Sequence, residues 1–347
     1  MKIAIVGEAV RGGWADTFYR AFKRTGADVF VYDDRAVFNK KIPFSKNRYL
    51  YRLFWWLMAM AVQSTFRKDI KNLSPDLVLI FKGFLWSPAT LIKLKKELPD
   101  TLFFNFNPDN PENTWHHGNS SRWIRNSIRI YDCYLIWSKQ IVERLKILGA
   151  NHSEYLACGY DKDLHYPVRL DDEELGLFGS DLSFVGSWDE EREEWISDLL
   201  NYNIKIWGNS WEKASSEVQA KWQKKAMSGE DFSRVCTASK INLNFLRKQN
   251  LDSHNMRTFE IPACAGFMMS RRSSEQQDFF KEGEEADYFS TPEELRQKID
   301  FYLKNDDLRK KIAATGYERL LKSEYSYDDR VREILAIYDK LSQETRK

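Results

Sequence analysis

The sequence of 347 residues lacks several patterns that identify common classes of site. Its four cysteines form no C-x-x-C pair and no Cys/His cluster at metal-ligand spacing. No P-loop string occurs, and the glycine-containing turn at 7–13 does not fit G-x-G-x-x-G. These absences argue against a disulfide framework, a zinc site and a nicotinamide fingerprint. They predict four reduced thiols in a cytoplasmic protein: Cys133, Cys158, Cys236 and Cys264.

Long apolar runs are also scarce. The apolar N-terminal stretch is too short for a signal peptide and predicts a buried first strand instead. A second run, Leu53 to Val62, has 10 residues, too few to span a bilayer. The segment 48–68 around it is flanked by Arg and Lys, so two interpretations stay open. Length favours a helix packed on a sheet; the alternative is a peripheral contact with the inner membrane surface that receives a lipid-linked acceptor.

Charge is unevenly distributed although the net charge is only +2. Residues 1–165 contain 25 Lys and Arg against 16 Asp and Glu, whereas the remainder contains 28 against 35. A basic half suits an anionic substrate or a membrane surface, and surface solubility alone would produce the same split. Nothing in the sequence predicts a nucleic-acid partner.

Strand and helix patterns alternate along the chain, which is typical of parallel βαβ units. The pattern restarts after about residue 165, so the fold class predicted is α/β with two Rossmann-like, doubly wound domains. Ligands in such sheets bind outside the carboxyl ends of the strands. The strands are predicted at 2–7, 27–33, 76–83, 101–109, 132–138, 181–187, 239–246 and 265–270, with a further strand and turn at 204–211.

The stretch HNMRTFEIPACAGFMMS, residues 254–270, carries the most chemistry. Pro262 is tolerated only near a helix start, which predicts a short helix that begins around Asn255 to Thr258. Its free N–H groups, beside Arg257, would suit a diphosphate. Glu260, one turn in, could accept both hydroxyls of a ribose; the alternative, favoured by chemistry alone, is an ion pair with Arg257.

A second candidate phosphate site is the turn after the first strand. Gly12 and Gly13 could let backbone amides approach a phosphate. A flexible turn without a ligand explains these glycines equally well.

Several of these stretches resemble one enzyme family. The strings SKINLNF, HNMRTFEIPACAGFMMS, FFKEGEEADYFSTPEELRQKIDFYL and RKKIAATGYERLL resemble the C-terminal domain of CgeB-like glycosyltransferases, GT-B enzymes named after a spore maturation protein. An Asn-Pro-Asp-Asn-Pro box at 107–111 and residues 131–167 resemble the first domain. The resemblance implies two Rossmann-like domains facing each other across a cleft. Residues 1–165 would bind the acceptor, 166–324 the nucleotide sugar, and a helix at 325–347 would cross back.

The resemblance also implies roles for individual residues. Two acidic residues of the family, with seven others between them, match Asp252 and Glu260, the first near the transferred sugar and the second at the ribose. Asp252 is shorter than the acid of the family. Trp211 is a candidate for the nucleobase wall or for the core. The remaining donor contacts implied are Asn255, Arg257, Arg192, Gly186 and Ser187.

The activity implied is transfer of a hexose (class EC 2.4) from a nucleotide-diphosphate sugar, with retention. It needs neither metal nor cofactor, because Arg257, Arg192 and helix-end dipoles can neutralise the diphosphate. Asp109 is the candidate to contact the sugar or take a proton from the acceptor, and His116 and His117 are the alternatives. The acceptor is left open among glycans, lipid-linked or anionic molecules and proteins. Rival functions are a nucleotide-sugar epimerase and a non-catalytic nucleotide-sugar sensor, which the shorter Asp252 favours.

Overall fold

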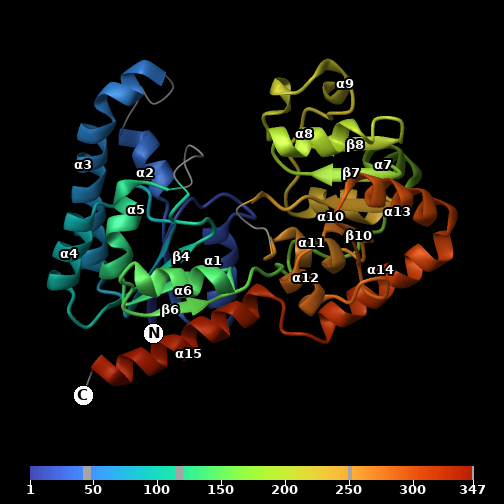
Figure 1. Ribbon diagram of the computed structural model, residues 1–347. Helices are drawn as coiled ribbons and strands as arrows, with labels where there is room; N and C mark the ends of the chain where they lie inside the picture. The colour runs from blue at the N-terminus through green and yellow to red at the C-terminus, as the bar shows by residue number, and fades with distance from the viewer. Residues whose placement is uncertain (42–47, 114–119, 249–251, 346–347) are drawn as a thin grey trace. The chain divides into compact units, whose positions relative to one another are not determined.

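The computed structural model describes residues 1–41, 48–113, 120–248 and 252–345 (Figure 1). The chain divides into two compact units. The first unit contains Met1–Ala157 and Tyr327–Lys347, and the second contains Cys158–Ser326. The C-terminal helix α15 (Tyr327–Thr345) thus belongs to the first unit. The change of unit after Ala157 comes earlier in the chain than the position near residue 165 expected from the sequence.

The first unit is built on a six-stranded sheet in the order β2-β1-β3-β4-β5-β6. Every neighbouring pair is parallel, as the alternation of strands and helices predicts. The chain leaves β1 toward β2 and returns to β3 on the other side, so the strand order reverses between β1 and β3. The strands are β1 (Lys2–Val6), β2 (Asp28–Tyr32), β3 (Leu77–Phe81), β4 (Leu102–Asn107), β5 (Cys133–Ile136) and β6 (Ser153–Tyr155).

Helices α1 (Trp14–Arg24) and α15 share one core with this sheet (Figure 1). Phe18 and Phe22 of α1 pack in that core with Val331 and Ile334 of α15. An ion pair of 2.5 Å between Arg24 and Asp328 joins the same two helices. The other helices of this unit are α2 (Asp34–Lys41), α3 (Arg48–Leu73), α4 (Pro88–Glu97), α5 (Arg122–Ser127), the 3-10 turn η1 (Ile128–Ile130) and α6 (Lys139–Ile147).

Helix α3 contains the apolar segment for which the sequence left two interpretations. Val62, Phe66 and Ile70 are fully buried, and the Phe66 ring stacks on Trp86 at 3.9 Å. The later part of α3 therefore packs inside the first unit, whereas Met60 is 45% exposed. The side chains at 48–59 lie outside the described residues. Within the part of the chain that the structure describes, no helix combines the length and apolarity needed to cross a membrane.

The second unit repeats the architecture with five parallel strands in the order β11-β10-β9-β7-β8. Here the strand order reverses between β7 and β9. The two sheets with their helices confirm the α/β, doubly wound fold class. The strands are β7 (Leu182–Val185), β8 (Ile204–Trp207), β9 (Ile241–Asn244), β10 (Met268–Arg271) and β11 (Asp287–Phe289).

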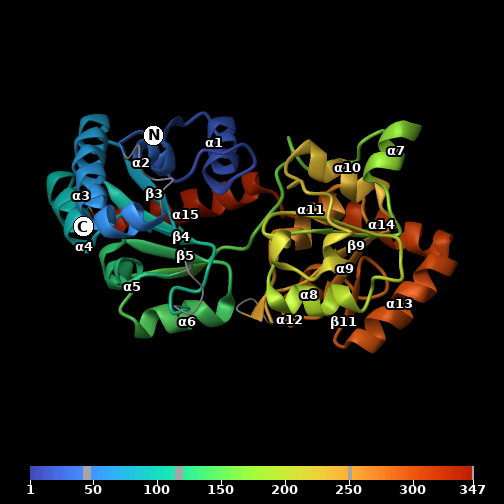
Figure 2. The ribbon, with the colours of Figure 1, turned by 90° about the horizontal axis from the view of Figure 1, so that it is seen from above.

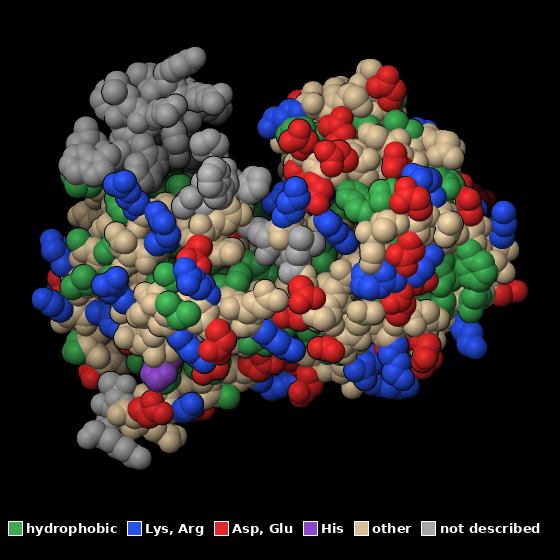
Figure 3. All heavy atoms as spheres, viewed as in Figure 1, with side chains coloured by type: hydrophobic (Ala, Val, Ile, Leu, Met, Phe, Trp, Pro, Cys, Tyr) green, Lys and Arg blue, Asp and Glu red, His purple; other side chains and the backbone are tan. Residues whose placement is uncertain are grey.

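Helices of the second unit cover its sheet, with α8 beside α9 and α13 beside α14 (Figure 2). Ile196 of α8 and Leu295 and Ile299 of α13 lie in one core with Leu182 and Phe184 of β7. Acidic and basic side chains are interspersed over the face of this unit seen in Figure 3. Its helices are α7 (Asp172–Phe178), α8 (Glu190–Ser197), the 3-10 turn η2 (Trp211–Lys213), α9 (Ser216–Gln219), α10 (Glu230–Ala238), α11 (Arg257–Ala263), α12 (Ser274–Phe279), α13 (Pro292–Lys304) and α14 (Asp306–Leu321).

Candidate functional site

The reversal of strand order between β7 and β9 marks the place where a doubly wound sheet binds ligands. Gly186 and Ser187 follow β7 directly, and the loop after β9 leads to α11, which begins at Arg257. The predicted helix start around Asn255 to Thr258 is therefore confirmed. Side chains from both loops and from α11 meet at this edge of the sheet.

Arg257 and Glu260 form an ion pair across the first turn of α11, between Nη1 and Oε2. Arg257 Nε also donates to the carbonyl of Val185 at 3.3 Å, and the guanidinium lies 4.2 Å from the centre of the Phe232 ring. Glu260 is only 5% exposed. This pair satisfies the buried carboxylate in the way that chemistry alone favours. The ribose partner of Glu260 stays a prediction.

The second carboxylate oxygen of Glu260 faces a residue that the sequence did not single out. His165 Nε2 lies 3.7 Å from Glu260 Oε1, and both side chains are buried. The His165 ring also makes an edge contact with Phe232, the ring beneath Arg257. Glu260 is thus bordered by a cation on one oxygen and by an imidazole on the other.

Arg192, on α8, donates hydrogen bonds to both the loop after β7 and the loop after β9. Its Nη1 donates to the carbonyl of Ser187 at 2.8 Å, and its Nη2 donates to the carbonyl of Phe245 at 3.3 Å. Burial, followed by the nearby positive charge of Arg247, lowers the pKa of Arg192 to about 10. Arg257 contributes to the same shift. Two guanidinium groups therefore repel that of Arg192, an arrangement that a bound anion would relieve.

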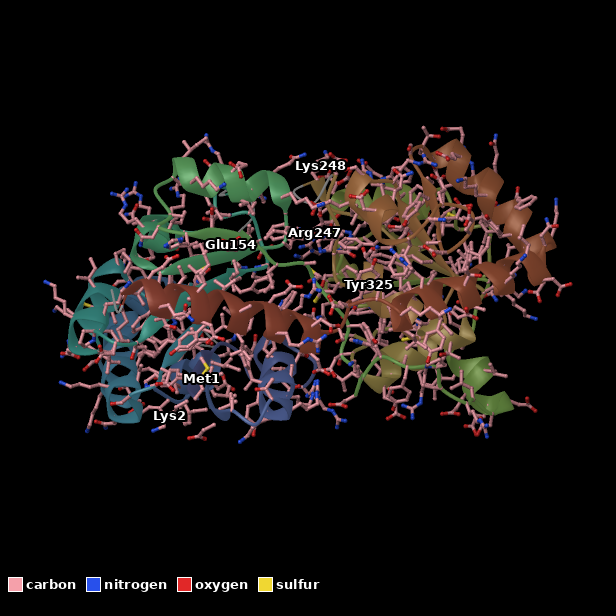
Figure 4. The ribbon with its side chains drawn as sticks, turned by 90° about the horizontal axis from the view of Figure 1, so that it is seen from below. Met1, Lys2, Glu154, Arg247, Lys248 and Tyr325 are labelled. Atoms are coloured by element: carbon pink, nitrogen blue, oxygen red, sulfur yellow. The ribbon has the colours of Figure 1, made fainter. Side chains whose placement is uncertain are left out.

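Arg247 and Lys248 extend from the loop after β9 (Figure 4). Arg247 Nε lies 3.2 Å from Asp189 Oδ2, and the same carboxylate oxygen lies 3.4 Å from Arg192 Nε. One carboxylate is thus shared by two of the three arginines. The positive charge of this group is only partly neutralised by Asp189.

Close packing explains both glycines of this region: a Cβ at Gly186 would lie 2.7 Å from the Phe184 ring, and Gly208 lies against backbone. Gly208 has φ +143°, and a Cβ there would lie 2.0 Å from the carbonyl oxygen of Gly186. That carbonyl also accepts the indole N–H of Trp211 at 2.9 Å. Trp211 is fully buried, so it supports the Gly186 turn from the core and cannot form a nucleobase wall.

The start of α11 offers fewer open N–H groups than the sequence suggested. The amides of Thr258, Phe259 and Glu260 donate to carbonyls of Asn255 or Met256 at 3.0–3.2 Å. The predicted cradle of several free amides is therefore wrong in its extent, because a tight turn at 255–258 uses these donors internally.

Asn255 has a supporting position in this turn. Its Nδ2 donates to Asn244 Oδ1 at 2.8 Å, and its Oδ1 accepts the Thr258 amide at 3.2 Å. Gln276 Oε1 joins the same buried network by accepting from Thr258 Oγ1 at 2.9 Å. Asn244 and Gln276 are functional candidates that the sequence reasoning missed. The signal was two asparagines, Asn242 and Asn244, in an otherwise apolar strand.

Asp252 lies in the loop between β9 and α11 and is exposed, and it contacts the first residue of α12. Its Oδ1 accepts the amide of Ser274 at 3.1 Å. Hydrogen bonds from the hydroxyl and the amide of Ser274 hold the pKa of the Asp252 carboxyl below its usual range. Asp252 is therefore ionised at neutral pH, and its contact with a transferred sugar stays a prediction.

In the first unit, the turn after β1 uses its glycine amides internally. The amide of Gly12 donates to Asp16 Oδ2 at 2.8 Å, and the amide of Gly13 donates to the carbonyl of Val10 at 2.8 Å. A phosphate at Gly12 would have to displace a carboxylate. This geometry favours the ligand-free turn over the phosphate site for Gly12 and Gly13.

Asp109 follows β4 and pairs with a lysine that the sequence did not indicate. Lys82 Nζ lies 2.6 Å from Asp109 Oδ2. Lys82 follows β3 with φ +62°, a left-handed conformation that is uncommon for a residue with a side chain. His116 and His117, the alternatives to Asp109, lie outside the described residues.

The described residues contain no group of three or more His, Cys, Asp or Glu side chains that could hold a metal ion. The sequence includes one D-x-D string, at Asp161-Lys162-Asp163. Asp161 is 1% exposed, and its Oδ1 accepts the amide of Asp163 at 2.9 Å. This string therefore forms a local turn. The four cysteines are all free and buried.

Comparison with known proteins agrees with this architecture. Residues 191–336 match the protein family described as glycosyl transferase-like. This part of the chain is similar to glycosyl transferase-like domains. It comprises most of the second unit and the beginning of α15. A search among curated proteins found no significant sequence match.

Similar solved structures span the whole chain. Sucrose-phosphate synthase from Thermosynechococcus elongatus has a TM-score of 0.69 at 11% identity, covering 98% of this chain and 99% of that one. Anabaena HepE in complex with UDP-glucose has a TM-score of 0.67 at 10% identity, covering 98% and 100%. A glycosyltransferase from Rickettsia africae has a TM-score of 0.65 at 15% identity, covering 98% of each chain. The chain therefore has the GT-B fold. The CgeB-like subtype stays a prediction.

Proposed function

We propose that this protein transfers a sugar from a nucleotide-diphosphate donor to an acceptor, and that the second unit binds the donor. The observation that carries this proposal is the gathering of Arg192, Arg257 and Glu260 at the carboxyl ends of β7 and β9. Cations there suit a diphosphate, and a carboxylate beside them suits a diol. The glycosyl transferase-like match at 191–336 and the UDP-glucose held by HepE support the same class of ligand.

The proposed chemistry needs charge stabilisation on the leaving diphosphate. Arg257 and Arg192 supply it without a metal, because negative charge develops on the phosphate oxygens as the bond to the sugar breaks. Gly186 and Ser187 bring backbone close to the same phosphates. Glu260 holds the ribose, and Asp252 approaches the transferred sugar. Retention of configuration follows from the resemblance and belongs to the proposal.

The first unit is proposed to bind the acceptor. Asp109 contacts the sugar or takes the acceptor proton, and Lys82 orients it. The excess of Lys and Arg over Asp and Glu within residues 1–165 suits an anionic or lipid-linked acceptor. A peripheral membrane contact of the segment 48–68 would have to come from residues before the buried Val62.

The test is turnover with a panel of UDP, GDP, ADP and dTDP sugars, with EDTA in one series and magnesium in the other. Free nucleotide diphosphate and released sugar are measured by chromatography and NMR. Release of nucleotide diphosphate that is unaffected by EDTA and lost in Arg257→Met is expected. Isomerised donor would instead indicate an epimerase, binding without turnover a sensor, and dependence on magnesium would contradict the metal-free mechanism.

A further inference from the structure

Glu260 has one exchangeable partner and one fixed partner. Arg257 contacts Oε2 from a side chain that is 24% exposed, so its guanidinium is open to a ligand, and a turn toward that ligand would give up the 3.3 Å hydrogen bond from Nε to the Val185 carbonyl. The His165 side chain is 8% exposed, faces Oε1, and is held in place by one hydrogen bond and one ring contact. The amide of Asp161 donates to its Nδ1 at 3.1 Å, and its ring packs edge-on against Phe232.

The hydrogen bond from Asp161 decides which imidazole nitrogen carries the proton. Since Nδ1 accepts an N–H, it has no hydrogen of its own, and the neutral ring carries its hydrogen on Nε2. Nε2 is the atom that lies 3.7 Å from Glu260 Oε1. The N–H of His165 is therefore on the nitrogen nearest to the carboxylate oxygen that Arg257 does not contact, at a distance somewhat longer than a hydrogen bond.

We propose that His165 is a positioning residue that holds the Glu260 carboxylate in place for a ribose and thereby makes donor binding selective for ribonucleotides. This inference rests on the proposed donor site. When Arg257 turns from Glu260 to a diphosphate, Oε2 becomes available to a ribose hydroxyl. His165 keeps the carboxylate from following Arg257, so the two oxygens remain directed at the diol.

The nature of the two partners explains why both are needed. A carboxylate with Arg257 as its sole neighbour would rotate to accept two guanidinium N–H groups, since bidentate pairing is the stronger geometry. Both oxygens would then be occupied and the diol would be excluded. A neutral imidazole competes for Oε1 without adding a second positive charge beside the arginine cluster.

Two variants separate this role from a purely structural one. His165→Phe retains the aromatic contact with Phe232 and removes the donor to Glu260. His165→Gln places an amide donor near the position of Nε2. Both variants lose the acceptor for the Asp161 amide, so they are matched for that cost to stability. Thermal unfolding of each variant provides the check on folding.

The readout is the ratio of calorimetric dissociation constants for a ribonucleotide and its 2′-deoxy counterpart. The probes are UDP with dUDP and GDP with dGDP. The unaltered protein should bind the ribonucleotide at least about tenfold more tightly than its 2′-deoxy counterpart. A hydrogen bond to a charged group contributes about that much to affinity. His165→Phe should bring the ratio close to one, and His165→Gln should restore most of it.

Three results would contradict the inference, and each would refute a different part of it. If His165→Phe keeps the ribonucleotide preference, the positioning role is wrong while the donor site stands. If the unaltered protein binds UDP or GDP without discriminating the sugar, Glu260 does not bind ribose. If it binds neither these four nucleotides nor ADP or dTDP, the other two diphosphates of the turnover panel, the proposed donor site itself fails.

Discussion

Lys82 and Asp109 form an ion pair of 2.6 Å between the loops that follow β3 and β4 in the first unit. Lys82 adopts φ +62°, and Gly83 next to it has φ +82°. A Cβ at Gly83 would lie 2.8 Å from the hydroxyl of Tyr131, so the turn is fixed by close packing. We interpret this uncommon conformation at a strand end as support for the proposed role of the pair in turnover, which the following variants test.

Replacing Lys82 by Met should reduce turnover of the donor sugar about tenfold or more, because Asp109 loses the charged hydrogen bond that orients it. Donor affinity should be unchanged, since the proposed donor site lies in the second unit. Steady-state kinetics and calorimetry measure the two quantities.

Lys95→Met is the matched control for Lys82→Met. Lys95 has the same 27% side-chain exposure and pairs with Asp132 at 2.5 Å, also in the first unit. Each substitution should lower the free energy of unfolding by about 1 kcal/mol. Equal losses of turnover in the two variants would show that Lys82 has only a structural effect.

Arg257→Met should weaken binding of a nucleoside diphosphate about 10- to 100-fold, because the site loses a charged donor. The variant should also be less stable by about 2 kcal/mol, since Glu260 remains buried with its cation removed. The double variant Arg257→Met/Glu260→Gln should recover stability but not affinity. Calorimetry and denaturant unfolding separate the two effects.

Arg234→Met provides the comparison for Arg257→Met. Arg234 has 26% side-chain exposure against 24% for Arg257, and it pairs with acidic residues on α10. Its loss should leave diphosphate affinity within about twofold, because its ion pairs are with carboxylates outside the proposed donor site. A similar drop in affinity for both variants would mean that general loss of positive charge, and not a specific contact, controls binding.

Gly208→Ala should disrupt the donor site, because the new Cβ would lie 2.0 Å from the carbonyl oxygen of Gly186. The loops after β7 and β8 would have to separate, at a cost of about 1–3 kcal/mol. Gly176→Ala on α7 is the control. It has open space around its Cβ position and should raise the free energy of unfolding by about 0.5–1 kcal/mol. Unchanged stability and diphosphate affinity in Gly208→Ala would refute this account of the turn.

The strands were predictable where burial makes them continuous apolar runs. Every residue of β3 and β4 is buried, and a strand covered on both faces shows such a run in sequence. Strands β6 and β11 were not predicted. Each has three residues and lies at the edge of its sheet, where a short strand carries little pattern.

The candidate site was predictable where its members are close in the chain. Arg257 and Glu260 are one helical turn apart, so their pairing follows from helix geometry. His165 and Lys82 were missed because their partners, Glu260 and Asp109, come from other elements. Trp211 could not be assigned to the core or to a ligand until its contact with the Gly186 carbonyl was known.

The free energy of unfolding of the second unit should decrease at acidic pH as the Glu294 carboxylate is protonated. Arg272 donates to both carboxylate oxygens of Glu294, at 2.8 and 3.1 Å, and lowers the pKa of that carboxyl to about 2. An acid with a depressed pKa stabilises the fold above its unfolded pKa, here 4.5, and this contribution is lost as pH falls toward 2. Glu294→Gln should therefore cost about 1–2 kcal/mol at pH 6, after allowance for solvent screening, and almost nothing near pH 2. Urea unfolding between pH 2 and pH 7 measures the difference in the free energy of unfolding between Glu294→Gln and the unaltered protein.

Glu318→Gln is the control for Glu294→Gln, because it removes an exposed ion pair with Lys322 and should show no such pH dependence. A difference in the free energy of unfolding that stays constant for Glu294→Gln between pH 2 and pH 7 would exclude the linkage.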